Sequence, residues 1–147
     1  MSTHTTPAAP RSLDTALRVV VVGLGIDAYV HFHLASRYDG LKGSGSLAVS
    51  QGVLFRAEAV AAILAALLVV LVRHRSSAVI AFLVLAGGFA AVILYHYVDV
   101  GEIGPLPAMH DPVWTTEKAI SAIAQGVAAV AALMLALQPA RRRAPVT

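Results

Sequence analysis

The sequence predicts an all-α integral membrane protein, a bundle of four transmembrane helices with both termini on the cytoplasmic side. Three observations lead to this prediction: an apolar composition, four apolar segments long enough to cross a bilayer, and positive charge beside the ends of those segments. Of the 147 residues, 58% are hydrophobic and 13% are charged, and the mean hydropathy is +0.76. Soluble domains have roughly 45–50% apolar and 25% charged residues, so the composition indicates lipid as the solvent.

A helix needs about 20 apolar residues to cross the hydrocarbon layer, and four segments meet that requirement. We expect helices at residues 13–36, 51–72, 77–98 and 117–137. They form a membrane domain of residues 13–138, between a disordered cytoplasmic tail (1–12) and a basic cytoplasmic tail (139–147). The two middle helices are joined by only a few residues, so they form a tight antiparallel hairpin.

Each segment carries its own signals. The first is the most polar, with several ionisable residues in its second half. The second and third are rich in small residues, including Gly87-Gly88, and small residues let helices approach closely in lipid. The fourth follows Thr115 and Thr116, either of which can cap it, and Glu117 favours its N-terminus.

Basic residues set the predicted orientation. They gather beside the N-terminus, the middle turn and the C-terminus: Arg11, Arg18, Arg73, Arg75 and Arg141 to Arg143. Positive charge marks the cytoplasmic side, so all three places face the cytoplasm and the loops at residues 37–50 and 99–116 face outward. We therefore expect a multi-pass protein of the inner (cytoplasmic) membrane of a bacterium. The basic residues flank apolar segments, so the net charge of +3 indicates lipid and not nucleic acid as the partner.

Most ionisable residues fall in the outer half of this arrangement. Asp27 lies about 12 Å below the outer end of the first helix, and Glu58 lies about 10 Å below the outer start of the second. An ionisable group inside the bilayer is expected to face the bundle interior and to find a partner there. Asp27 and His31 are four residues apart, so they share one face of the first helix.

A metal site near the outer surface is one function that these residues suggest. Its candidate ligands are Asp27, His31, Glu58 and His96, with His110 or Asp111 closing the site from the loop. Imidazole and carboxylate ligands suit zinc, iron, manganese or copper(II). The chain has no cysteine, which excludes disulfides and thiolate ligands.

Other polar residues at this end are expected to form a supporting network. They are His33, Arg56, Asp99, Asp111 and Glu117. Trp114 is expected to anchor the protein at the membrane interface. The second loop, with three prolines and two glycines between Gly101 and Trp114, is expected to be a stiff cover. The first loop, with Gly and Ser at residues 43–46, is expected to be flexible.

Three functions stay open at this point. The polar cluster can bind a metal ion, a proton or a small ligand; it can be a structural network in an accessory subunit; or it can hold haem through His31 or His33 with His96 as axial ligands. We expect a binding or accessory role rather than an enzyme. The expected partners are the lipid bilayer and either further copies of the chain or a larger membrane complex.

One pattern of residues resembles a known group of proteins. It comprises Asp27-x-Tyr29-x-His31-x-His33-Leu34, then Tyr38-Asp39, then Arg56-x-Glu58. This pattern, together with the Ala-, Val- and Arg-rich composition, resembles uncharacterised small four-helix integral membrane proteins of actinobacterial type over most of residues 15–138. The resemblance implies the fold, and it implies no mechanism because the group has no established activity.

Overall fold

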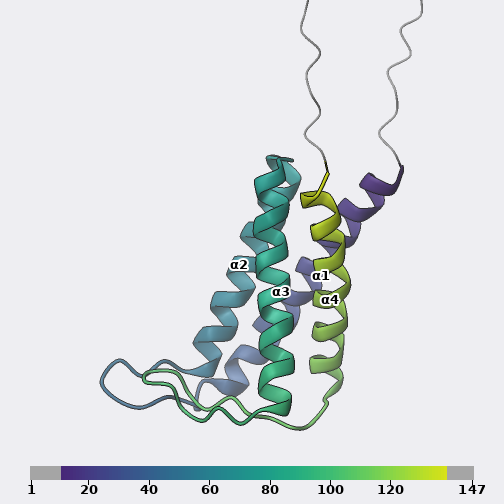
Figure 1. Ribbon diagram of the computed structural model, residues 1–147. Helices are drawn as coiled ribbons and strands as arrows, with labels where there is room; N and C mark the ends of the chain where they lie inside the picture. Colours follow the sequence, from purple (N-terminus) through teal and green to yellow (C-terminus); the bar gives the residue numbers. More distant parts are fainter. Residues whose placement is uncertain (1–10, 139–147) are drawn as a thin grey trace, which may run out of the picture.

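The computed structural model describes residues 11–138, which form four long helices and no β-strand. The helices are α1 (Arg11–Ala35), α2 (Gln51–Leu71), α3 (Arg75–Tyr97) and α4 (Thr116–Ala136), with a short 3₁₀ helix, η1 (Ser36–Tyr38), continuing α1 (Figure 1). All four are long and apolar enough to span a membrane. The predicted fold class, an all-α bundle of four membrane-spanning helices, is therefore confirmed. The tails at residues 1–10 and 139–147 lie outside the described residues.

The helix ends lie within two residues of those predicted, and side-chain caps fix three of the starts. Ser50 Oγ accepts a hydrogen bond from the backbone N of Val53 at 3.1 Å, at the start of α2. At the start of α4, Thr115 Oγ1 accepts from the backbone N of Lys118 at 3.2 Å, so Thr115 is the cap. Each cap satisfies a backbone N–H that has no partner within the helix.

Small residues dominate the core of the bundle. Helix α1 packs against α2 and α4, and α3 packs against α4. The fully buried positions include Ala59 and Ala62 of α2, Ala81 of α3 and Ala132 of α4. A Cβ atom on Gly23 of α1 would overlap the side chain of Ala128. Such close contacts suit helices in lipid, where packing rather than water drives association.

The two ends of the bundle differ in construction. At one end, α2 and α3 are joined by a three-residue turn in which Arg73 has a φ of 47°. From this turn α2 and α3 diverge toward the opposite end, where both long loops lie (Figure 1). The loops bond to each other: Val49 N donates to the carbonyl of Pro105 at 2.9 Å, and Ser44 bonds to Glu102. The first loop, expected to be flexible, is thus held by the second.

Candidate functional site

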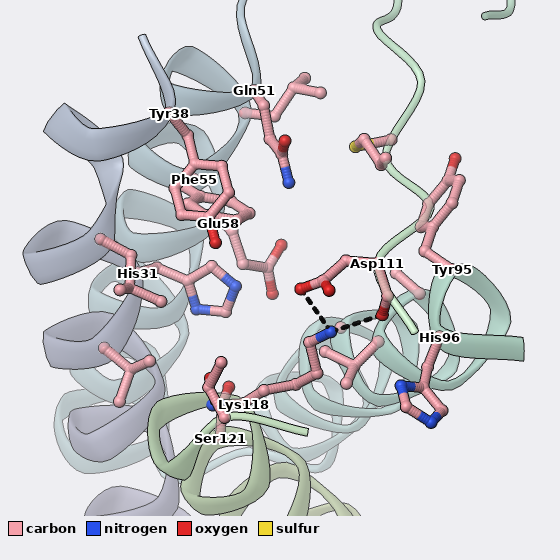
Figure 2. A pocket seen from close by; sticks show the side chains of 18 residues that line it. His31, Tyr38, Gln51, Phe55, Glu58, Tyr95, His96, Asp111, Lys118 and Ser121 are labelled. Atoms are coloured by element: carbon pink, nitrogen blue, oxygen red, sulfur yellow. Dashed lines mark hydrogen bonds and ion pairs between the residues drawn. The ribbon is translucent and has the colours of Figure 1, made fainter. Parts of the chain in front are cut away.

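A cavity of about 250 Å³ lies among the four helices at the loop end. Polar and aromatic side chains from all four helices and the second loop surround it (Figure 2). Those that bear on its chemistry are His31, Tyr38, Gln51, Phe55, Glu58, Gly88, Tyr95, His96, Asp111, Lys118 and Ser121. The cavity occupies the space into which α2 and α3 diverge, so the geometry of the bundle creates it.

A buried polar cluster centred on Asp27 lies beneath one wall of the cavity. The Asp27 side chain is 0% exposed. Its Oδ1 lies 2.9 Å from Nδ1 of His31 and accepts a hydrogen bond from Nε2 of Gln125 at 2.6 Å. Ser121 Oγ lies at 3.5 Å from the same oxygen, while Oδ2 of Asp27 has no partner among the described residues. Asp27 and His31, which were expected to share one face of the first helix, are in contact, and α4 supplies the rest of the cluster.

Glu58 brings a second carboxyl group to this region from α2. Its Oε1 is buried and has no hydrogen-bond partner among the described residues. Gly88 of α3 makes room for it, because a Cβ atom there would lie 3.0 Å from Oε1 and would overlap the Gln125 amide. Glu58 also interacts electrostatically with Asp27 and His31. Two carboxyl groups from different helices are therefore near enough to influence each other within the membrane-spanning part of the bundle.

Burial makes the ionised form of an acid such as Glu58 costly. It lies seven residues inside α2, about 10 Å from the start of that helix. An ionised carboxylate near the bilayer centre costs about 2.5–3.5 kcal/mol unless it finds a partner. A bound proton or a positively charged neighbour removes that cost.

A lysine–aspartate pair joins the second loop to α4 at the cavity. Lys118 Nζ donates to Oδ2 of Asp111 and to its backbone carbonyl, both at 2.7 Å (Figure 2). The hydrogen bond from Lys118 lowers the pKa of Asp111 below its ordinary value. The backbone N of Asp111 donates to the carbonyl of Tyr95 at 3.0 Å, which ties the loop to the end of α3.

Aromatic rings line two sides of the cavity. Tyr38 and Phe55 lie together on one side, with ring centroids 5.1 Å apart, and Tyr95 lies on the opposite side (Figure 2). Phe55 also contacts His31 edge to face at 5.2 Å. Glu58 lines the same cavity as these aromatic residues.

The structure brings only some of the predicted metal ligands together: Asp27 and His31 are in contact near Glu58, whereas His96 and His110 lie elsewhere. The ring of His96 points away from His31 and Glu58 and packs on Trp114, with ring centroids 4.3 Å apart (Figure 2). His110 lies exposed in the loop, where its Nδ1 bonds to the carbonyl of Tyr95. Within residues 11–138, no three histidine, aspartate or glutamate side chains lie close enough together to share a metal ion. Residues at similar depths on different helices need not point toward the same centre. Here the rotation of α3 directs the His96 ring toward Trp114.

The expected haem ligand His33 also lies away from the cavity. Its side chain is exposed and its ring stacks on Tyr29 at 5.8 Å. Two positions along a helix rotate a side chain by about 200°, so His31 and His33 occupy different faces of α1. His31 alone of the two lines the cavity.

The remaining predicted polar residues make local contacts outside the cavity. Arg56 donates to both carboxylate oxygens of Asp39, at 2.6 and 2.8 Å, and this bond lowers the pKa of Asp39. Glu117 lies 3.8 Å from Arg37. Asp99 accepts a hydrogen bond from the backbone N of Gly101. These contacts stabilise the loop end of the bundle. None of them involves Glu58, whose buried Oε1 stays without a hydrogen-bond partner among the described residues.

The sequence did not predict the part of α4 in the site, nor the aromatic residues Tyr38, Phe55 and Tyr95 that line the cavity. Lys118, Ser121 and Gln125 all lie on α4, and they share one face because they are spaced at i, i+3 and i+7. Polar residues at this spacing in an otherwise apolar membrane helix indicate a helix face that points into the bundle. Trp114, expected as an interface anchor, is 44% exposed beside His96.

Comparison with known proteins adds no family to these observations. No protein-family model matches the sequence, and neither a curated protein nor a solved structure is significantly similar to it. Function is therefore inferred from the residues of the cavity.

Proposed function

We propose that the protein is a multi-pass membrane protein that binds a small molecule in the cavity at the loop end of the bundle. The observation that carries the proposal is the buried Oε1 of Glu58, which has no partner among the described residues and belongs to a residue lining the cavity. Folded proteins pair nearly all buried polar groups, and unpaired ones mark sites with a role or an unseen occupant. A cavity beside an unpaired buried oxygen favours a bound ligand as the partner of that oxygen.

The alternatives have less support. A metal ion needs several ligands at short distances, and residues 11–138 offer no such group. An accessory subunit without a ligand would need neither the cavity nor the unpartnered carboxyl oxygen of Glu58. Small-molecule sites combine apolar and aromatic walls with a few polar groups, as this cavity does.

We also propose on which side of the membrane the cavity opens. Arginine residues beside the α2–α3 turn favour a cytoplasmic position for that end, and the cavity then opens on the outer side of a bacterial cytoplasmic membrane. The ligand would reach the protein from outside the cell or from the outer leaflet.

A matched pair of cavity variants tests the proposal. The full chain in lipid nanodiscs is titrated with phenyltrimethylammonium and, separately, with its uncharged isostere tert-butylbenzene. The single tryptophan, Trp114, is the reporter because it packs on His96 of the cavity wall. We expect a saturable fluorescence change with at least one probe, abolished in Ala91→Phe, which fills the cavity, and kept in Ala90→Phe, whose side chain lies outside it. Absence of saturation with both probes, or equal binding in Ala91→Phe, would overturn the proposal.

A further inference from the structure

The charged groups around Glu58 form ion pairs with one another and leave Glu58 without a partner of opposite charge among the described residues. From α1, Asp27 and His31 face it and bond to each other. From α4 and the second loop, Lys118 and Asp111 reach the cavity and bond to each other. From α3, the titratable groups lining the cavity are Tyr95 and His96, and the ring of His96 points away (Figure 2).

No cation of its own helix compensates Glu58 either. Arg56 is two residues away, on another face of α2, and both its terminal nitrogens bond to Asp39. With these pairs counted as neutral, the cavity carries one uncompensated carboxyl group. Neutrality at that group requires a proton or a positively charged ligand, because an isolated charge is poorly solvated inside the bilayer.

The aromatic residues supply the rest of a cation site. Tyr38 and Phe55 line one side of the cavity that contains Glu58, and Tyr95 lines the other (Figure 2). The faces of aromatic rings attract cations, and an ammonium group enclosed by rings and one carboxylate is a recurring form of amine recognition. The cavity volume of about 250 Å³ suits a small organic cation.

We infer that the ligand is a small organic monocation, such as a tertiary or quaternary amine, which replaces a proton on Glu58. This inference rests on the proposed ligand-binding function of the cavity. In the exchange, the O–H bond of the Glu58 carboxyl group breaks and the proton passes to water at the loop end. The cation takes its place beside the carboxylate, no other covalent bond changes, and the net charge of the cavity stays the same.

The test compares the two isosteres and counts protons. Phenyltrimethylammonium and tert-butylbenzene differ only in a charged nitrogen that replaces a carbon. Calorimetric titration of the full chain in zwitterionic nanodiscs, in two buffers of different ionisation enthalpy, gives the number of protons released. We expect release of one proton per bound cation, tighter binding of the cation than of the isostere, and up to a tenfold gain in cation affinity per pH unit while Glu58 is protonated.

Two variants test whether Glu58 is the group that releases the proton. Glu58→Gln should abolish proton release and the preference for the cation while keeping tert-butylbenzene binding. Glu102→Gln, which removes an exposed loop carboxyl group outside the cavity, should behave as the wild type. If Glu58→Gln fails to fold, Glu58→Asp keeps the exchangeable proton and should release it with lower cation affinity.

The outcomes separate this inference from the proposed function. Equal binding of both isosteres without proton release overturns the inference and leaves the proposed function standing. Proton release that persists in Glu58→Gln overturns the assignment to Glu58. Absence of binding by both probes overturns the proposed function itself.

Discussion

Gly87 and Gly88 are neighbours in α3 but face different surroundings. A Cβ atom on Gly87 would meet open space, whereas one on Gly88 would meet the Gln125 amide and the Glu58 carboxyl group. The sequence indicated that this pair allows close helix packing. It did not distinguish the two glycines, because their roles depend on which side chains the neighbouring helices direct at them.

Alanine substitution of the two glycines should therefore give opposite results. Gly88→Ala overpacks the polar centre, and we expect it to lower the free energy of unfolding by about 1–3 kcal/mol. Gly87→Ala should be neutral or stabilise by up to about 1 kcal/mol, because alanine is the better helix former. Unfolding of each detergent-purified variant in increasing SDS measures the difference. Equal midpoints for the two variants would contradict the assigned role of Gly88.

Prediction of single residues succeeded within a helix and failed between helices. The pairing of Asp27 with His31 follows from a spacing of four along α1 and is present. The hydrogen bond from Gln125 to Asp27 joins residues 98 positions apart, and only the packing of α1 on α4 creates it. The direction of His96 depends on the rotation of α3, which its almost uniformly apolar sequence does not specify.

At the level of elements, the four helices could be predicted closely because each depends on local sequence. Apolar length sets the span, and Ser50, Thr115 and the residues of the short turn set the ends. The second loop was expected to be a stiff cover, and it bonds to α3 through His110 and Asp111 and to α4 through Asp111. The packing of the first loop on the second involves residues distant in sequence, so the composition of the first loop alone suggested flexibility.

The link between the second loop and α4 should weaken in acid. Lys118 holds the pKa of Asp111 below its ordinary 3.8, so the ion pair stabilises the fold fully above that pH. This stabilisation is lost as the pH falls through the lowered pKa. For a partly exposed pair the effect is small, about 0–1 kcal/mol. Thermal unfolding midpoints of wild type and Asp111→Asn should differ at pH 6, and the difference should shrink as the pH falls below 3.8; a constant difference would show that the ion pair is not the cause.

For the whole molecule, composition and segment length predicted the architecture, whereas the cavity could not be foreseen. It arises because α2 and α3 diverge from their turn, a relation between helix axes rather than a property of any segment (Figure 1). The sequence nevertheless indicated the end of the bundle at which it lies. Ionisable residues avoid lipid, and their concentration at one end marked the place where the helices enclose polar space.

Orientation in the membrane can be tested directly because the chain has no cysteine. Ser46→Cys places one thiol in the exposed first loop, and Ser76→Cys places one at the exposed start of α3, at the opposite end. We expect a membrane-impermeant maleimide to label Ser46→Cys in intact cells and to label Ser76→Cys only after lysis. The reverse pattern would place the cavity on the cytoplasmic side.

The depth of Glu58 has an electrical consequence. Its carboxyl group lies about 10 Å inside a hydrocarbon layer of about 30 Å, so a charge there senses about one third of the membrane potential. A lone cation moving to that depth gains or loses about 0.8 kcal/mol per 100 mV, a change in affinity of about fourfold. Exchange of a cation for a proton moves no net charge. The affinity should then be the same in polarised and depolarised vesicles, and the site would respond to acidity while remaining indifferent to voltage.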